Sequence, residues 1–566
     1  GDTQYRRPTE AFMNQVSDYL RNKYGYETGP YQNYNISTPD WKLMARIDWN
    51  INDNHRLNIR YSQTMNKYSS EPSTSISPLS TSDVYNRNIY SRTSEYALTF
   101  KNSNYYQEQN FFSLAAELNS SFLDGAVTNM FRATWSHQYE PRSWDGNAFP
   151  TVDILEYVDA DNDPATGTDG KETRAVMTSF GLDPFTYGNL RDVHTVTLTD
   201  EVNIVKGINN ITAGVQFEYD LTKNGYMQGG LGYYVFDSWD DFVNDEKPVA
   251  FAITHPNNDS LSQEYPSFSY MQTSLYVQDE LNIADNFKLT AGLRFEIPTY
   301  PALKNNHNVE FSELAAQSQT FNGMATDDMP KARLSVSPRI GFNWDILRNR
   351  RLILRGGSGI FTGRIPFVWI VSAIGNSNCI QNQYVDNSGT GSYTPHFHDN
   401  VNDILNEMYG GTYTRKDLYA PTLPTIMDKN LKMPSAWKSS LALDAKLPGG
   451  IKATVEGIYS KDLTSVKTHL LGIEERSMQL PGEPDSRVTW VYENNGNLRS
   501  GSGGRVTPYY LTNSSVNGFY ASVTAQLQKD FNFGLSLMAA YTWSESQSLG
   551  EGWGDQVTSS YSALNY

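Results

Sequence analysis

An acidic stretch, DADNDPATGTDGKE from Asp159 to Glu172, is the sharpest candidate for a ligand site. Its candidate ligands are Asp159, Asp161, Asp163 and Asp169. Hard cations such as Ca²⁺ bind several carboxylate and carbonyl oxygens on flexible loops, so this spacing favours calcium. The stretch departs from the EF-hand pattern, because Pro164 and Gly170 stand where that pattern requires a glycine and a bidentate glutamate. A solvated acidic loop is the alternative interpretation.

The other residues capable of chemistry do not form a catalytic pattern. His396 and His398 in PHFHD are two residues apart, with Asp399 beside them, and are a weaker candidate for a metal site. The sequence contains no G-x-S-x-G, H-E-x-x-H or Walker-type loop. The single cysteine, Cys379, excludes an intramolecular disulfide and cysteine-based zinc sites. We therefore expect no enzyme activity.

Tyrosine, asparagine and glycine are concentrated between the apolar segments. The clearest case is NGYMQGGLGYYVFDSW, from Asn224 to Trp239. Aromatic and amide surfaces suit peptides or glycans. This stretch supplies the candidate ligand-binding residues Tyr226, Tyr233, Tyr234 and Trp239. Ordinary exposed loop chemistry explains the same composition equally well.

The segments that must position these residues alternate apolar and polar side chains. LMARIDWNINDNHRLNIRYSQ, from Leu43 to Gln63, does so on both sides of a short polar break. A period of two predicts a strand with two different faces, so this stretch predicts a β-hairpin. Six further hairpins of the same kind follow, which gives about 14 strands of roughly 9 to 13 residues. Such lengths are close to those of tilted membrane-spanning strands.

The connections predict a membrane barrel more strongly than the strands do. The turns inside the hairpins are a few residues long, whereas roughly 35 to 70 residues separate one hairpin from the next. Short turns at one end and long loops at the other are typical of outer-membrane β-barrels. Aromatic residues near both ends of the strands match the girdles of such barrels. A soluble antiparallel sheet with one face in water remains the alternative.

If the apolar side chains face lipid, the alternate positions face a wet lumen. These lumen-facing candidates are Arg46, Asp48, Arg60, Arg294, Glu296 and Arg339. We also expect short helices in the loops, the clearest from Thr9 to Tyr24, between Pro8 and Gly25.

The composition of the chain limits the classes of molecule that it can bind. The chain has 566 residues, a net charge of −17 and 39% hydrophobic residues. The negative charge argues against nucleic acid as a partner, because phosphate binding requires basic patches. No apolar run is long enough for a transmembrane helix, and the first residues lack the apolar stretch of a signal peptide.

Several segments together resemble the barrel of TonB-dependent outer-membrane receptors, in particular the Oar-like group common in Bacteroidetes. The most telling are KYGYETG, ARIDWNINDNHRLNIRYS, YVQDELNIADNFKLTAGLRFE, SPRIGFNWD, GIFTGRIPFVWI and WKSSLALDAKLPGGIKATVEGIYSKD. The resemblance implies a 22-strand barrel in the bacterial outer membrane, preceded by a plug domain that contacts TonB. We therefore expect residues 1–566 to form a single, partial barrel domain that lacks the plug, the N-terminal domain and the last strands.

The resemblance also implies a function. It is energy-coupled import of a ligand too large or too scarce for porins, such as an oligopeptide or a glycan. The implied partners are the TonB complex, acting through the plug, outer-membrane lipid, and a surface lipoprotein or another outer-membrane protein. Calcium is the only candidate cofactor. The alternative function is protein export, adhesion or surface assembly, since some Oar-like proteins are linked to secretion.

Overall fold

The computed structural model describes residues 8–79, 91–94, 96–159, 172–303, 305–414, 419–476, 489–493 and 498–548. Its main element is a 14-stranded sheet in which each strand pairs with its neighbours in sequence order. These strands are β1 (Asp40–Asn52), β2 (His55–Ser70), β4 (Tyr105–Phe122), β5 (Val127–Trp144), β8 (Leu190–Lys206), β9 (Asn209–Gly225), β12 (Ser267–Ala284), β13 (Phe287–Thr299), β14 (Ser335–Asp345), β15 (Leu352–Thr362), β18 (Ser435–Leu447), β19 (Ile451–Thr464), β24 (Phe519–Asp530) and β25 (Ser536–Gln547).

The first hairpin shows why the alternating sequence forms this sheet. Ile47 pairs with Ile59 and Trp49 pairs with Leu57, so the apolar side chains of both strands share one face. Arg46 pairs with Arg60 on the other face. The polar turn lies between Asn52 and His55, as the alternation predicts. All pairs in the sheet are antiparallel, so the predicted antiparallel sheet of about 14 strands is confirmed.

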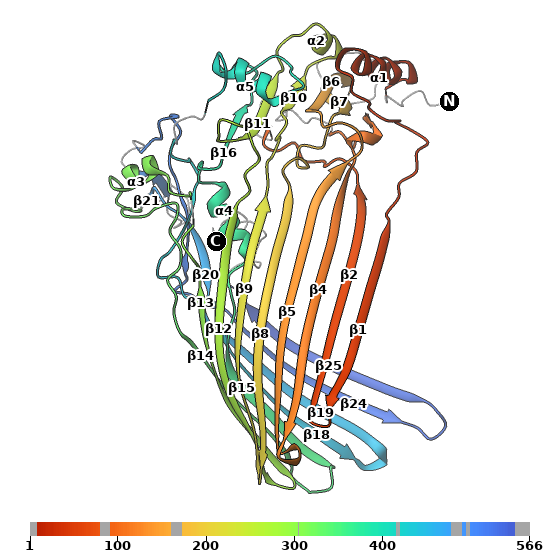
Figure 1. The fold of residues 1–566 in the computed structure, drawn as a ribbon, viewed down its shortest axis with the longest axis vertical. Coiled ribbons are helices and arrows are strands. Elements are labelled where there is room, and N and C mark those ends of the chain that lie inside the picture. Colours follow the sequence, from red (N-terminus) through yellow and green to blue (C-terminus); the bar gives the residue numbers. More distant parts are fainter. Residues whose placement is uncertain are drawn as a thin grey trace, which may run out of the picture.

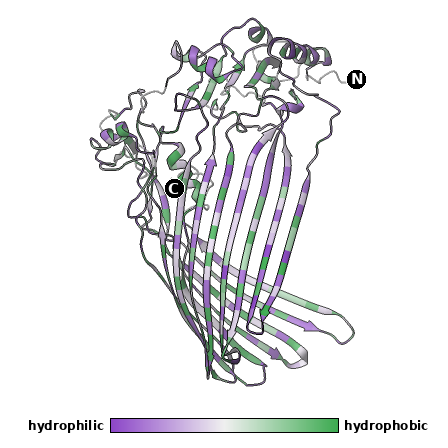
Figure 2. Cartoon of the chain, viewed as in Figure 1, coloured by the Kyte–Doolittle hydropathy of each residue, from purple (hydrophilic) through white to green (hydrophobic). Residues whose placement is uncertain are grey.

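The sheet curves so that its later strands cross behind its first ones (Figure 1). The short turns lie at the lower end, and the longer connections gather at the upper end (Figure 1). Apolar and polar residues alternate along the strands (Figure 2). Large apolar side chains are exposed along one face of the sheet, among them Ile47, Trp49, Leu198, Val277, Leu293, Ile340, Leu441, Val455 and Val523.

The long connections build a second structure above the sheet, which we call the cap (Figure 1). Its centre is a mixed six-stranded sheet in the order β16-β11-β10-β6-β7-β3. Its strands are β3 (Leu98–Thr99), β6 (Thr151–Asp159), β7 (Glu172–Phe180), β10 (Tyr233–Phe236), β11 (Ala250–Pro256) and β16 (Gln381–Asp386). They come from four different connections, and β6 pairs with β10 in parallel. The alternating segments of the sequence did not predict this second sheet.

Helices cover the cap sheet. They are α1 (Glu10–Tyr24), α2 (Trp239–Val243) and α5 (Val401–Tyr409). The Thr9 side chain caps the start of α1, and Gly25 ends it with a positive φ of 66°, close to the predicted bounds. Met13, Val16 and Leu20 of α1 are buried in the same apolar cluster as Phe242 and Ile404. The cap thus has a hydrophobic core of its own.

A smaller unit lies beside the cap (Figure 1). It contains α3 (Val309–Ala315), α4 (Phe367–Gly375), β17 (Thr425–Met427), β20 (Val466–Leu470), β21 (Ile473–Arg476), β22 (Thr489–Tyr492) and β23 (Tyr509–Asn513). Residues of α4 pack with Phe268 and Tyr270 at the upper end of β12. In the described part of the chain, no helix is long and apolar enough to cross a membrane.

Candidate functional site on the concave wall and in the cap

A single arginine identifies the two faces of the sheet. Arg364 lies two residues after the end of β15, yet its Nη1 lies 2.6 Å from Glu218 Oε1 and 3.4 Å from Asp220 Oδ2 on β9. Three strands separate β15 from β9 in the sheet. A side chain can reach across several strands of a curved sheet only on the concave side, where the strands curve toward one another. Glu218 and Asp220, which Arg364 reaches from the end of β15, therefore belong to the concave face. The exposed apolar side chains belong to the convex face.

The residue pairing between neighbouring strands extends this assignment of faces to the other strands of the sheet. It places all six lumen-facing candidates on the concave face, namely Arg46, Asp48, Arg60, Arg294, Glu296 and Arg339. Arg46 forms two hydrogen bonds of 2.8 Å with Asp48, and Arg294 Nε lies 2.8 Å from Glu296 Oε1. The Arg339 guanidinium lies 4.5 Å from the ring centre of Phe361.

Further ion pairs on the concave face continue this pattern. Arg355 Nε lies 2.8 Å from Asp444 Oδ2, and Arg132 Nε donates to Glu117 Oε2 at 2.7 Å. Cations and carboxylates therefore alternate along the wall and largely compensate one another. Such a surface can bind polar groups of either sign.

Three of the four candidate ligand-binding residues are buried. Tyr233 and Tyr234 in β10 are fully buried, and Trp239 at the start of α2 is 8% exposed. Tyr234 packs on Phe251 and Phe397, with ring centres 4.7 and 5.0 Å apart. A dissolved ligand has no access to these three side chains in this structure, because they form the core of the cap.

Tyr233 also belongs to a buried polar network that joins separate loops. Arg92 Nη2 lies 2.9 Å from Asp153 Oδ2, and the Tyr233 hydroxyl donates to the same oxygen at 2.7 Å. Burial raises the pKa of the Asp153 carboxyl, but the charge and hydrogen bonds of Arg92 outweigh it and hold that pKa below its usual value. Arg92 also donates to the backbone oxygens of Ser73 and Ser75. This network fixes the first long connection to the cap sheet.

The fourth candidate, Tyr226, remains accessible. Its side chain is 41% exposed, and its ring stacks on Phe185 with centres 6.4 Å apart. Tyr393 and Tyr419, in the connection between β15 and β18, are exposed to a similar degree. The sequence interpretation did not single out these two tyrosines. Exposed aromatic rings of this kind offer stacking surfaces to peptides or sugars.

The acidic candidate for calcium lies largely outside the described residues. Asp159 is the last residue of β6, and its backbone pairs with Glu172 at the start of β7. Asp161, Asp163 and Asp169 lie outside the described residues. The calcium site therefore stays a prediction.

The two histidines of PHFHD bind a carboxylate that the sequence pattern did not reveal. His396 Nδ1 and His398 Nε2 lie 2.7 and 2.6 Å from the two oxygens of Glu407 in α5. The backbone N–H of His396 donates to the same carboxylate. Each ring engages a different carboxylate oxygen, so this arrangement fastens the loop to α5.

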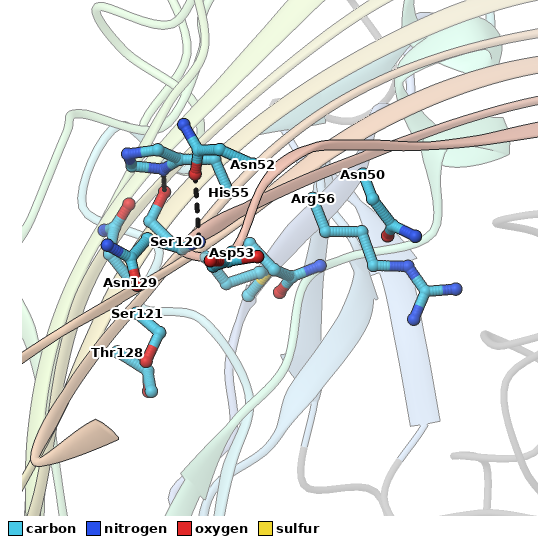
Figure 3. Close-up of a pocket in the computed structure, with 12 residues that line it drawn as sticks. Asn50, Asn52, Asp53, His55, Arg56, Ser120, Ser121, Thr128 and Asn129 are labelled. Atoms are coloured by element: carbon cyan, nitrogen blue, oxygen red, sulfur yellow. Dashed lines mark hydrogen bonds between the residues drawn. The ribbon is translucent and has the colours of Figure 1, made fainter. Parts of the chain in front are cut away.

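A polar pocket of about 680 Å³ lies at the opposite end of the sheet, beside the turn between β1 and β2. Amide and hydroxyl groups from Asn52, Ser120 and Asn129 line it (Figure 3). Asn52 Oδ1 accepts a hydrogen bond from the backbone of Asn54, and His55 Nδ1 lies 2.9 Å from Ser120 Oγ. The lining thus supplies both hydrogen-bond donors and acceptors.

A family model described as "Outer membrane beta barrel domain" matches residues 8–566, almost the whole chain. The chain belongs to this family. The 14-stranded antiparallel sheet, with its apolar convex face and polar concave face, is therefore part of an outer-membrane β-barrel. Its location is the bacterial outer membrane.

Solved outer-membrane barrels resemble the chain at low sequence identity. One is the outer membrane transporter YddB from Escherichia coli, with 12% identity and a TM-score of 0.49, covering 90% of this chain and 48% of that chain. Another is the siderophore receptor PirA from Pseudomonas aeruginosa, with 8% identity and a TM-score of 0.41, covering 90% and 57%. The FrpB iron transporter from Neisseria meningitidis has 10% identity and a TM-score of 0.43, covering 90% and 53%. The chain spans about half the length of these proteins. No curated protein matches it.

The barrel also carries a cluster that the sequence interpretation missed. His137 of β5 and Asp192 and His194 of β8 lie together on the convex face. The sequence did contain an indication of this cluster, because all three polar residues occupy strand positions at which the alternating pattern otherwise places apolar side chains. Their proximity could not be read from the sequence, because it depends on the register between two strands separated by a long connection.

Proposed function

We propose that this chain is the barrel portion of a TonB-dependent outer-membrane transporter that imports a ligand too large or too scarce for porins. The observation that carries the proposal is the segment after β15, which crosses the concave side and pairs Arg364 with Glu218 and Asp220. A segment that folds against the polar concave wall brings further side chains to the side that becomes the lumen of a closed barrel. Such an arrangement suits capture of a ligand before it passes through the barrel.

The concave wall supports import of a polar ligand. Its compensated pairs, such as Arg294–Glu296 and Arg355–Asp444, present donors and acceptors without a strong net charge. Tyr226, Tyr393 and Tyr419 add exposed rings above the wall. An oligopeptide or a glycan matches this combination, because both carry many hydrogen-bonding groups and surfaces that stack on aromatic rings.

The finer family assignment and the partners belong to the same proposal. The motifs that resemble Oar-like receptors of Bacteroidetes support a plug domain that contacts TonB. They also support a surface lipoprotein or another outer-membrane protein as a partner. Outer-membrane lipid would contact the apolar convex face.

Gene deletion tests this function. Cells lacking the full-length protein should lose uptake of labelled oligopeptides or oligosaccharides from a defined panel. Deletion of tonB, or collapse of the proton gradient, should abolish the same uptake in wild-type cells. Complementation with the wild-type gene should restore it.

Comparison of the secreted proteins separates import from the alternative of export. Normal uptake together with loss of secreted or surface proteins in the deletion strain would reject import. Uptake that persists unchanged without TonB would reject energy coupling.

A further inference from the structure

The convex face of the sheet carries a cluster of metal-ligating side chains beside large apolar and aromatic side chains. His137 on β5 pairs directly with His194 on β8, and Asp192 lies two residues before His194 on the same face. The neighbouring convex-face residues include Trp135, Tyr139 and Leu198. Two imidazoles and a carboxylate in this setting require an explanation beyond lipid contact.

The three side chains converge on one point. His137 Nε2 lies 2.9 Å from Asp192 Oδ1, and His194 Nε2 lies 3.6 Å from the same oxygen. The imidazole rings are stacked, with centres 3.9 Å apart and an angle of 11° between their planes. One ligand atom from each residue lies within 4.8 Å of the other two. Metal binding requires rotation of the two imidazoles out of their stacked arrangement, so that each ligand atom comes to roughly 2.0–2.2 Å from one ion.

The surroundings hold the ligands in place and leave one side open. Trp135 packs beside both imidazoles, with its ring centre 6.1 Å from each, and Phe112 stacks on His137 at 5.7 Å. All three ligands are partly exposed, His194 most of all. Tyr139, one position nearer the cap, lies 5.8 Å from His137 and marks the aromatic level at the extracellular interface. Lys223, opposite Asp192 on β9, is the nearest cation in the register.

We propose that His137, Asp192 and His194 form a binding site for a divalent transition-metal ion, Zn²⁺ being the representative, on the outer wall at the extracellular interface. Two imidazole nitrogens and a carboxylate oxygen are ligands that such ions favour over Ca²⁺ or Mg²⁺. The site is independent of the transport proposal, because it lies on the opposite face of the sheet from the concave wall.

Metal titration of the full-length protein in detergent tests this site. After chelator treatment, Zn²⁺ is titrated by calorimetry into wild type, His137→Ala/His194→Ala and Asp192→Asn. We expect one site in the wild type, at least a hundredfold weaker binding in the double variant, and at least tenfold weaker binding in Asp192→Asn. Heat-modified mobility on gels should show that every variant remains folded.

The chain offers a matched control in its other histidine pair. His396→Ala/His398→Ala removes two histidines that bind Glu407 in the cap, and it should keep the wild-type affinity for Zn²⁺. Absorption of the Co²⁺-loaded protein should change in the first double variant and remain unchanged in this control. Undiminished binding in His137→Ala/His194→Ala, or loss only in the cap variant, would overturn the proposal.

Discussion

At the residue scale, the buried carboxylate of Asp153 is the most sensitive position in the cap. Asp153→Asn leaves the Arg92 guanidinium buried without its countercharge, so the cap should lose about 3–5 kcal/mol of local stability. Amide hydrogen exchange in β6 and β10 should then accelerate by more than about a hundredfold.

The exposed pair between Arg21 and Asp18 on α1 is the control for this change. Asp18→Asn should leave exchange in the cap unchanged, because water screens an exposed ion pair. Equal effects from both substitutions would show that burial of Asp153 is not what makes it important.

The contacts of Glu407 predict that the stability of the loop containing His396 and His398 depends on pH. Burial raises the pKa of its carboxyl. Hydrogen bonds from the His396 backbone and from the two histidine rings lower this pKa by more than burial raises it, so the net shift is downward. Because the pKa is lower in the folded state, the ionised carboxylate stabilises the loop at pH values above the unfolded pKa of roughly 4.3. This stabilisation is lost as the pH falls through the folded pKa. Hydrogen exchange around His396 should therefore accelerate below about pH 4.

Glu407→Gln separates this carboxylate from the other acids of the cap. The variant should show fast exchange around His396 at neutral pH and little further acceleration as the pH falls below about 4. A variant that keeps the acid-induced acceleration of the wild type would assign it to another group.

The candidate sites show how far residue types alone could be interpreted. Tyr233, Tyr234 and Trp239 have the composition of a binding loop, but they are buried because their segment forms a strand and a helix of the cap. The partner of His396 and His398 lies on a helix nine to eleven residues later, so the contact depends on how the loop folds back onto that helix. Burial and side-chain convergence depend on tertiary structure, so the sequence could name the chemical groups and not their surroundings.

At the scale of single elements, the two faces of a strand should differ sharply in tolerance to charge. Val277 in the middle of β12 lies on the convex face, so Val277→Arg places a cation against lipid and should cost about 2–4 kcal/mol. Unfolding by guanidinium in lipid bilayers measures this change.

The next residue on the same strand is the control. Gln278 is also exposed but lies on the concave face, where Gln278→Arg meets water and should leave the unfolding midpoint nearly unchanged. Similar losses from both substitutions would contradict the assignment of the faces.

The barrel strands could be predicted because each one carries its own evidence. A strand with lipid on one side and polar surroundings on the other must alternate, as Ile47 and Arg46 do. The cap strands carry no such signal, because both faces of β10 and β11 are buried. A short apolar run of that kind is equally compatible with a buried helix or a loop core.

At the scale of the whole molecule, the cap and the barrel differ in how far apart their paired residues lie in the sequence. The two strands of a barrel hairpin are separated by only a few residues in the sequence, as the pairing of Asn52 with His55 shows. In the cap, Tyr233 pairs with Thr151, and Phe251 pairs with Asp386. Closing such large loops carries a greater entropic cost unless other contacts have already brought their ends together.

This topology implies an order of assembly. The hairpins of the barrel gather the ends of the cap strands, so the cap should fold after the barrel has formed. Pulse-labelling hydrogen exchange during refolding into micelles should protect β4, β5 and β8 before β6, β10 and β11. Simultaneous protection would show that the cap nucleates without the barrel. A late-folding cap would act as a check on barrel assembly, because its core closes only when hairpins from distant parts of the chain are correctly paired.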